Sequence, residues 1–496
     1  MKRITELQPT IVWKYFHEVT QTPRPSKKEV KMIRYLEAFA AGHNLSIKKD
    51  EVNNVLISKP ATPGFEQLPT VILQSHLDMV CEKNSEVAFD FENDPIETIV
   101  DGEWVRANGT TLGADNGIGI AVSLAILASD DVEHGPIECL FTVDEETGLT
   151  GANALAEGFM KGTVLLNLDS DGEGEMFIGC AGGKGTVATF AFEPVAAPPS
   201  MTYLRIGISG LNGGHSGCDI HKGLGNANKI LARFLYLLKK DLHFVLASFD
   251  GGNLHNAIAR EASAIIGIDG NNKEDVRVLL NCFTADIENE LRYADPNVKI
   301  TLETIDAPDT CFSDDFTGKL VNALLACPHG VTGMSHAIAD LVETSTNLAS
   351  VKTTGEQTVV VGTSQRSSIE SAKNAIADQV AAVFLLAGAT VVHGEGYPGW
   401  APNPDSKVLK AAQETYRKLF GKEPQVKAIH AGLECGLFLE KYPYLDMISF
   451  GPTMRDIHSP NERLEIATVD LWWRHLLELL KNVGAYNNIH RETLLI

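Results

Sequence analysis

The sequence has few cysteines and no long apolar run, and these two absences argue against several classes of protein. Its 8 cysteines among 496 residues include no C-x-x-C pair, so we expect neither a disulfide framework nor a thiolate zinc site. No apolar stretch reaches the roughly 18 residues that a membrane-spanning helix needs. The first residues also lack the apolar core of a signal peptide. We therefore expect a cytoplasmic protein.

Positive charge is also scarce. The chain has 42 Lys and Arg against 64 Asp and Glu, which gives a formal net charge of −22. This excess repels the phosphates of nucleic acids and anionic lipid headgroups, so we expect neither a nucleic acid nor a membrane surface as a partner. Because a thiolate site is not expected, any bound metal must be held by histidines and carboxylates.

The hydrophobic pattern predicts an α/β sheet in the N-terminal part of the chain. A capping box at Ser26–Glu29 predicts the start of a helix that ends at Gly42. Strands at 71–73, 137–143 and 163–168 are mainly apolar, which is typical of a parallel sheet covered on both faces. In such sheets ligands collect at the carboxyl ends of the strands, so we expect the polar residues that follow these strands to meet at one rim.

The pattern between about residues 203 and 388 differs from the rest of the chain. It repeats the order β-α-β-β-α, which indicates an inserted domain with a duplicated α/β layer. In this interpretation the strand at 297–306 begins the second copy. We therefore predict three segments, which are a first part of a catalytic domain at 1–187, an inserted domain at 188–393 and a second catalytic part at 394–496.

A run of three acids follows the strand at 137–143. Side chains alternate along an extended chain, so Glu145 and Glu146 leave the backbone in different directions. One of the two can then bind a cation while the other transfers a proton. The alternative is a solvated acidic loop, and partners elsewhere in the chain decide between these interpretations.

Five side chains, Glu146 among them, together have the chemistry of a dinuclear metal site. Two imidazoles and three carboxylates suit a pair of zinc ions better than calcium or copper. One carboxylate must bridge if each metal is to have three protein ligands, and Asp115 is suited to this because it lies at the mouth of a buried helix. Asp78 lies on the same side of an extended segment as His76 and can orient its ring. The predicted ligands are His76, Asp115, Glu146, Asp169 and His458.

The order of the motifs around these residues resembles that of a known family. The motifs are HLD at 76–78, GADNG at 113–117, DEETG at 144–148, LD at 168–169 and HSPNER at 458–463. They are similar to those of the co-catalytic zinc exopeptidases related to aminoacylase and glutamate carboxypeptidase. This resemblance implies an α/β fold in which a phosphorylase/aminopeptidase-like zinc peptidase catalytic domain carries an inserted lid domain.

A narrower resemblance concerns one branch of that family. Four other segments are similar to the bacterial cytosolic non-specific dipeptidases, also called aminoacyl-histidine dipeptidases. These segments are NLDS at 167–170, IGCAGG at 178–183, GGHSG at 213–217 and AGLECG at 431–436.

The resemblance also implies roles for single residues in metal binding. It implies that His76 and Asp169 hold one zinc ion. A second zinc ion is held by Glu146 and His458, with Asp115 bridging the pair. Co²⁺ or Mn²⁺ can act as substitutes for the two Zn²⁺ ions.

The other implied roles concern catalysis and substrate binding. Glu145 becomes the general base, and Asp78 supports His76. His215 donates to the oxyanion, and the alternative for it is a histidine of a structural turn. The resemblance implies that Arg366 binds the terminal carboxylate of a substrate and that Asn256 contacts the peptide. It implies that Glu434 contacts the free amine. A surface ion pair is the alternative for the arginine, and a solvent-facing carboxylate for the glutamate.

We therefore predict a homodimeric, dinuclear zinc dipeptidase with broad specificity for unblocked dipeptides, including Xaa-His. Because the order of elements in the insert occurs twice, the second copy can take the place of a partner subunit, and we expect His215 to act within its own chain. One alternative is an amidase or deacetylase of the same chemistry. A second alternative is a catalytically silent binding protein on this fold.

Overall fold

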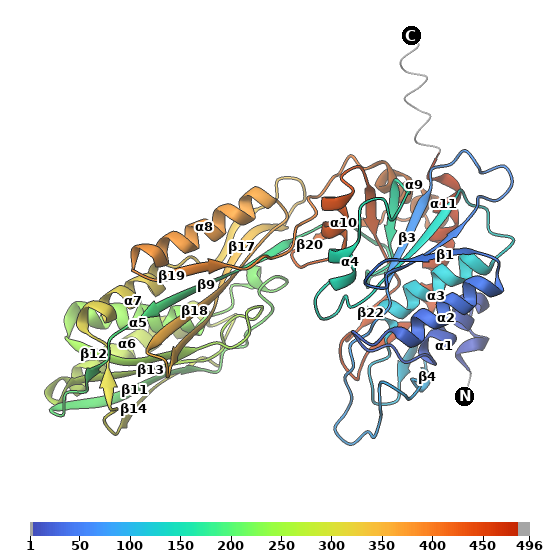
Figure 1. Ribbon diagram of the computed structural model, residues 1–496. Helices are drawn as coiled ribbons and strands as arrows, with labels where there is room; N and C mark the ends of the chain where they lie inside the picture. The colour runs from blue at the N-terminus through green and yellow to red at the C-terminus, as the bar shows by residue number, and fades with distance from the viewer. Residues whose placement is uncertain (1–2, 485–496) are drawn as a thin grey trace, which may run out of the picture. The chain divides into compact units, whose positions relative to one another are not determined.

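The computed structural model describes residues 3–484 and forms two compact units (Figure 1). The second unit contains the predicted insert and extends beyond it at both ends. Within the described residues, no helix is long and apolar enough to cross a membrane. The first unit is made of the segment that ends at Gly179, Pro402–Ala428 and the segment that begins at Leu433, and the second of Cys180–Ala401 and Ile429–Gly432.

The first unit alternates strands and helices, as its hydrophobic pattern predicts. Its helices are η1 (Ile4–Glu6), α1 (Thr10–Thr20), α2 (Val30–Gly42), α3 (Ala114–Ala128), α4 (Thr150–Ala154), α9 (Lys407–Phe420), α10 (Cys435–Lys441) and α11 (Ile466–Asn482). Its strands are β1 (Ser46–Lys49), β2 (Val55–Lys59), β3 (Val71–His76), β4 (Thr98–Asp101), β5 (Trp104–Ala107), β6 (Ile137–Thr142), β7 (Val164–Asn167), β8 (Glu175–Cys180), β20 (Gln425–Ile429), β21 (Asp446–Ser449), β22 (Met454–Arg455) and β23 (Arg463–Glu465).

Eight of these strands form a sheet in the order β1-β2-β6-β3-β7-β21-β8-β20. The neighbours β6, β3 and β7 are parallel, and all of their residues are buried. Helix α3 packs on β3, and α9 packs on β21. His76 at the end of β3 is opposite Thr142 at the end of β6. The prediction that the carboxyl ends of these strands meet at one rim is confirmed.

The predicted capping box at Ser26–Glu29 is wrong, because α2 begins only at Val30 and neither side chain caps it. Both side chains are instead bound by the loops at the sheet rim. Ser26 Oγ donates to Asp78 Oδ2 (2.7 Å), and Glu29 Oε1 accepts from the amide of Asp144 (3.0 Å). These long-range hydrogen bonds replace the local ones that the sequence pattern predicts.

The second unit is built mainly from long strands and four long helices. Its helices are η2 (Ile220–Lys222), α5 (Ala227–Asp241), η3 (Gly270–Asn272), α6 (Lys273–Leu291), α7 (Asp314–Ala326) and α8 (Glu370–Leu386). Its strands are β9 (Gly182–Ala191), β10 (Val195–Ala196), β11 (Met201–Ser209), β12 (Phe244–Gly251), β13 (Ala262–Asp269), β14 (Lys299–Ile305), β15 (Thr310–Cys311), β16 (Gly330–Met334), β17 (Val342–Thr354), β18 (Thr358–Ser367) and β19 (Thr390–His393).

The sheet of the second unit contains the same strand order twice. Its path is β14-β11-β13-β12-β17-β18-β9-β19, and β16 pairs with β17 off this path. In the first half, β11, β12, β13 and β14 are strands one to four of a β-α-β-β-α-β arrangement in the spatial order 4-1-3-2. In the second half, β9, β17, β18 and β19 take the same four positions. The predicted duplication is therefore confirmed.

The predicted division between the two copies is wrong. The strand at 297–306, observed as β14, pairs along its length with β11 and completes the first copy. The second copy begins instead with β9, so the first copy is nested between the first strand and the first helix of the second. From chain order alone, β14 belongs in the same copy as α7, the helix that follows it. In the sheet, β14 instead pairs with β11, which lies almost a hundred residues earlier in the chain.

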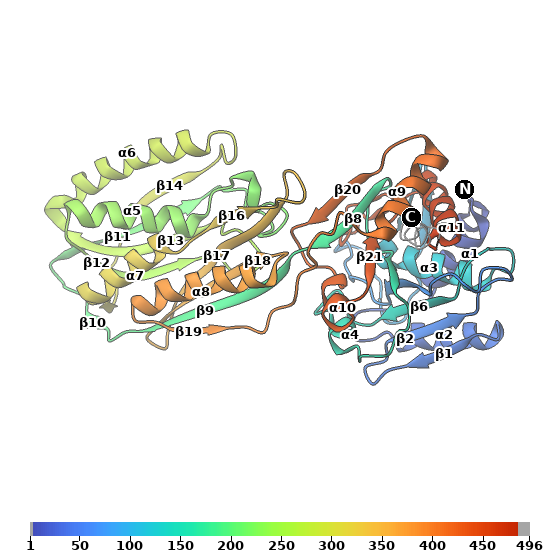
Figure 2. The same cartoon turned by 90° about the horizontal axis from the view of Figure 1, so that it is seen from above.

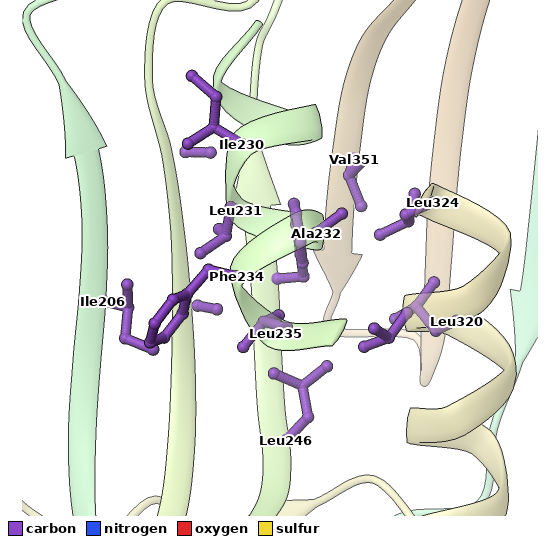
Figure 3. Close-up of a cluster of buried hydrophobic side chains, with 14 of the residues drawn as sticks. Ile206, Ile230, Leu231, Ala232, Phe234, Leu235, Leu246, Leu320, Leu324 and Val351 are labelled. Atoms are coloured by element: carbon purple, nitrogen blue, oxygen red, sulfur yellow. The ribbon is translucent and has the colours of Figure 1, made fainter. Parts of the chain in front are cut away.

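Helices α5, α6, α7 and α8 bury their apolar side chains in one core with this sheet, and Figure 2 shows the helices in a row over the strands. Figure 3 shows the centre of the core, where Phe234 and Leu235 of α5 point toward Ile206 of β11 and Leu246 of β12. All four side chains are fully buried. Burying a side chain of this size stabilises the fold by about 1.5–3 kcal/mol.

Candidate metal centre and substrate-binding residues

Asp115 lies between two histidines, and each of its carboxylate oxygens faces one of them. Oδ1 is 2.9 Å from His76 Nε2, and Oδ2 is 3.2 Å from His458 Nε2. Each imidazole also faces a second carboxylate. His76 Nε2 is 3.5 Å from Asp169 Oδ1, and His458 Nε2 is 3.1 Å from Glu146 Oε2. The five predicted ligands therefore lie in one cluster, in the pairs that the resemblance implies.

The fold explains why residues so distant in sequence meet. His76 is the last residue of β3, and Glu146 and Asp169 follow β6 and β7 on the same rim. Asp115 lies in the first turn of α3, which packs on β3. His458 comes from the loop between β22 and β23.

The donors in this cluster fit a pair of divalent metal ions. Ligand atoms of His76, Asp115 and Glu146 all lie within 4.8 Å of one another. Glu146 Oε1 is buried and has no hydrogen-bond partner among residues 3–484, and a buried unpaired acceptor is costly unless a cation binds it. The two oxygens of Asp115 face different imidazoles, which is the arrangement that a bridging carboxylate requires.

In the absence of metal, the charges in this cluster stabilise one another. Hydrogen bonds to Asp115 and Glu146 raise the pKa of His458 to about 11. Burial acts to raise the pKa of Asp115, but the hydrogen bonds of His458 and His76 lower it well below its usual value. Burial raises the pKa of Asp169 to about 7. Because metal ligands must be unprotonated, metal binding competes with these protons and depends on pH.

Asp78 connects His76 to the acidic loop. Its Oδ1 is 3.3 Å from His76 Nδ1, on the side of the ring away from Asp115. The same carboxylate accepts hydrogen bonds from the amides of Glu145 (3.0 Å) and Glu146 (3.2 Å). Burial opposes ionisation of Asp78, but its hydrogen bond with His76 and the charge of that ring lower the pKa to about 2. An ionised Asp78 therefore fixes both the ring and the loop.

A buried arginine that no sequence pattern indicates joins two of these loops. Arg24 is 2% exposed and donates to the carbonyl oxygens of Leu77 (3.0 Å) and Asp78 (2.6 Å) and to that of Gly113. It thus ties the loop that follows His76 to the loop that precedes Asp115. No local pattern around Arg24 indicates this role, because its partners are backbone carbonyls far away in the sequence.

A second residue missed from the sequence is Glu462, which is 2% exposed. Its carboxylate accepts hydrogen bonds from four consecutive amides of residues 112–115. It lies in the HSPNER motif, four residues after the predicted ligand His458. The HSPNER motif is the sequence signal that could have identified Glu462. The backbone amides that Glu462 binds are seen only in the folded structure.

Glu145 lies beside the cluster without being one of its paired carboxylates. Burial raises its pKa well above the usual value, and the nearby carboxylates of Asp169, Glu434 and Glu146 raise it further against the charge of His76. A carboxylate with a raised pKa is a better proton acceptor near neutral pH. This position fits the prediction that Glu145 transfers a proton while Glu146 binds a metal ion.

Glu434 is buried beneath the rim rather than facing solvent, so the solvent-facing alternative is wrong. Its Oε2 accepts from Gln74 Nε2 (2.6 Å) and Thr142 Oγ1 (2.9 Å). Its Oε1 is buried with no hydrogen-bond partner in the described part of the chain. Burial raises the pKa of Glu434 to about 7. One carboxylate oxygen is therefore fixed and the other is left for a donor.

In the second unit, His215 and Arg366 lie side by side. His215 Nδ1 accepts hydrogen bonds from the amides of Gly217 (3.3 Å) and Cys218 (3.2 Å), so the proton of the neutral ring is on Nε2. Burial and the charge of Arg366 lower the pKa of His215, which favours this neutral form. Arg366 Nη2 is 3.4 Å from His215 Nε2. Two donors that lie this close together need an acceptor such as an anionic oxygen.

Two further observations concern the residues around this pair. Arg366 is 7% exposed and makes no ion pair among residues 3–484, so the surface ion-pair alternative is wrong. Asn256 uses its backbone carbonyl to accept from the amide of Ser216 (2.8 Å). Its side chain is half-buried, and its contact with substrate stays a prediction.

The comparison with known sequences places the chain in a family of metallopeptidases. Residues 72–482 match the pattern of peptidase family M20/M25/M40, which is most of the chain. The chain therefore belongs to this peptidase family, and the predicted family, fold class and class of enzyme are confirmed.

The chain is also similar to individual peptidases of known name or structure. The chain is 40% identical to the cytosol non-specific dipeptidase of Escherichia coli (strain K12) over 485 residues, which cover 98% of this chain and 100% of that protein. The crystal structure of aminoacylhistidine dipeptidase from Vibrio alginolyticus is similar, with a TM-score of 0.91 and 42% identity over 97% of this chain and 98% of that chain. A tripeptidase from Staphylococcus aureus shares the fold at 18% identity, with a TM-score of 0.56 over 97% of this chain and 99% of that chain.

Proposed function

We propose that this protein is a dinuclear zinc dipeptidase that hydrolyses unblocked dipeptides with broad specificity, including Xaa-His. The observation that carries the proposal is the position of Asp115, whose two oxygens face His76 and His458 at 2.9 and 3.2 Å. The names of the E. coli and Vibrio relatives support the choice of dipeptides and of a C-terminal histidine. Zinc is proposed because it suits mixed imidazole and carboxylate ligands.

When bound, two zinc ions would lower the pKa of an attacking water and polarise the scissile carbonyl. Glu145, with its raised pKa, takes the proton of that water and returns it to the leaving amine. Asp78 holds the imidazole of His76 and the backbone of the acidic loop in place during the reaction. His215 donates its Nε2 proton in a hydrogen bond to the oxyanion.

The two ends of the substrate have separate binding groups. The free Oε1 of Glu434 accepts a hydrogen bond from the substrate ammonium group. Arg366 binds the terminal carboxylate, for which its planar guanidinium is suited, and Asn256 contacts the peptide. The requirement for both free ends distinguishes a dipeptidase from an amidase or a deacetylase of the same chemistry.

The proposal includes a cytoplasmic location, which the name of the E. coli relative supports. It also includes a homodimer, for which the family resemblance is the only basis. Neither affects the chemistry proposed for a single chain.

A panel of substrates tests the proposed function. We expect hydrolysis of Ala-His and other unblocked dipeptides, and little or no hydrolysis of their N-acetyl or C-terminal amide forms or of a tripeptide. Treatment with a chelator should abolish the activity. Turnover of N-acyl amino acids in place of dipeptides would identify an amidase or deacetylase, and bound metal without any hydrolysis would favour a silent binding protein.

A further inference from the structure

The hydroxyl group of Tyr397 lies against the guanidinium of Arg366. Arg366 Nη1 donates to Tyr397 Oη (2.9 Å), and Nε lies 3.4 Å from Ser216 Oγ. Since Oη accepts the arginine proton, its own O–H is directed elsewhere, and no oxygen or nitrogen of residues 3–484 accepts it. Burial raises the pKa of Tyr397, so the O–H stays protonated.

Two glycines make room for the Tyr397 ring. Gly183 of β9 is the strand partner of Arg366 on β18, and a Cβ atom at Gly183 would lie 2.6 Å from the ring. A Cβ atom at Gly432 would lie 2.9 Å from the other edge of the ring. Both distances are shorter than real side chains allow, so the ring occupies a slot that only glycine leaves open. The slot explains Gly183 of the IGCAGG motif and Gly432 of the AGLECG motif, two glycines to which the proposed mechanism gives no role.

The backbone of Tyr397 is held as firmly as its ring. Its amide donates to Gly183 O (2.9 Å), and its carbonyl accepts from Gly183 N (3.1 Å). The same carbonyl accepts from Lys373 Nζ (2.7 Å), and Lys373 is itself 3% exposed. Contacts of the ring and of the backbone together hold the Tyr397 hydroxyl against Arg366. A tyrosine that only filled space would not need this hydroxyl.

We propose that the Tyr397 O–H donates to the C-terminal carboxylate of the substrate alongside Arg366, and that it sets the preference for a free carboxylate. This inference rests on the proposed function, because it takes Arg366 as the carboxylate-binding group. A carboxylate accepts both donors well, whereas a C-terminal amide offers one acceptor oxygen and an NH₂ group that faces these donors unfavourably. Tyr397 is then a specificity-determining residue that also positions Arg366.

The Tyr397→Phe variant tests the inference, because it keeps the ring in its slot and removes only the hydroxyl. We expect KM for an unblocked dipeptide to rise roughly ten- to a hundredfold, as for other hydrogen bonds to a charged group, with kcat within about twofold because the contact is the same in ground and transition state. For the C-terminal amide of the same dipeptide, which should be hydrolysed slowly at most, any measurable kcat/KM should not change. Gly183→Ala, which displaces the ring, should reproduce the loss for the acid.

Tyr203→Phe is a matched control in the same unit, since it removes a buried tyrosine hydroxyl that donates to Pro198 O (3.0 Å). It should leave both substrates unaffected. An equal loss for acid and amide in Tyr397→Phe, or no loss for either, would overturn the inference.

Binding constants separate this inference from the proposed function. In a Glu145→Gln background, calorimetry with the dipeptide and with its amide gives the acid-to-amide ratio of Kd without any turnover. Tyr397→Phe should lower this preference for the acid roughly tenfold or more, and an unchanged ratio would refute the role of Tyr397. Failure of the proposed function would appear elsewhere, as wild-type protein that hydrolyses no dipeptide.

Discussion

Glu462 and Asp115 are joined by a hydrogen bond from the Asp115 amide to Glu462 Oε1 (3.3 Å). The amide of Ala114 donates to the same oxygen (2.7 Å), and those of Leu112 and Gly113 donate to Oε2 (2.7 and 2.9 Å). A carboxylate from the loop of His458, a proposed metal ligand, thus holds the backbone of Asp115, the proposed bridging ligand. The relationship predicts that Glu462 controls metal binding without contacting the metal.

We expect Glu462→Gln to weaken metal binding. An amide group replaces one of the two accepting oxygens, so two backbone N–H groups lose their partner and the backbone of Asp115 shifts. Loss of such a supporting group typically costs 10- to 100-fold in metal affinity. Competition with a chromophoric chelator measures the change, and Glu465→Gln, a partly buried neighbour that makes no such contacts, is the matched control. Equal affinity in the two variants would contradict the role given to Glu462.

The two adjacent glutamates should respond differently to the same substitution. Glu145→Gln should retain both metals and lose several orders of magnitude in kcat, because it removes proton transfer and not a ligand. Glu146→Gln should lose metal, because its Oε2 faces His458 at 3.1 Å. Metal content by mass spectrometry, with kcat on a dipeptide, tests both. Loss of metal in the first variant alone would mean that the roles are exchanged.

The sequence predicts the rim of the sheet well, because each part of that prediction depends on a local pattern. Strands β3, β6 and β7 each contain an apolar run and are buried at every position, and each ends near a residue able to bind metal. Parallel pairing then places those ends together whatever the rest of the fold does. The pairs formed by Asp115 with His76 and His458 do not follow from this rim, because Asp115 lies in α3 and His458 in the loop between β22 and β23, and only the family resemblance implied them.

What the sequence could not predict depends on partners that are distant in the chain. Ser26 and Glu29 match a capping box, yet the loops of Asp78 and Asp144 bind them instead. Strand β9 begins with glycines and a lysine, so its sequence does not look like a central strand, and its role as the first strand of the second copy went unnoticed. Arg24 acts through backbone carbonyls, for which sequence patterns carry no signal.

A buried histidine far from the metal centre predicts how stability changes with pH. His475 Nε2 is 2.9 Å from Ala412 O, and burial lowers the pKa of His475 to about 4. Between pH 6.5 and 4 the unfolded chain binds a proton here and the folded chain does not, so stability rises with pH in this window. From pH 7 to 5 this histidine should therefore cost about 2 kcal/mol of stability.

Urea unfolding of the metal-free protein at pH 7 and pH 5 measures this effect. His475→Gln keeps a donor for Ala412 O and removes the titrating ring, so it should lose less stability on acidification than the wild-type protein. His243→Gln, at an exposed position, is the control and should behave as wild type. An equal acid sensitivity of His475→Gln and wild type would show that this ring is not kept neutral by the fold.

The doubled sheet leads to a prediction about how the site is completed. Strands β12 and β17 join the two halves of the sheet at Asp250 and Gly251, so one chain supplies two lid-like copies. We therefore expect His215 to act within its own chain even in a dimer. Mixing inactive His215→Ala with inactive Glu145→Gln, under conditions where subunits demonstrably exchange, should restore no activity. Recovery toward a quarter to a half of the wild-type rate would show that His215 acts on a partner subunit.

The most direct test of the central claim is a titration of the metal-free protein with zinc while hydrolysis of an unblocked dipeptide is followed. In the cluster one carboxylate lies between two histidines, and each histidine faces a second carboxylate, so the proposed site should need two metal ions. We predict no activity without metal and a maximum at two equivalents of zinc per chain. Undiminished hydrolysis by the metal-free protein, or a maximum at one equivalent, would contradict the account.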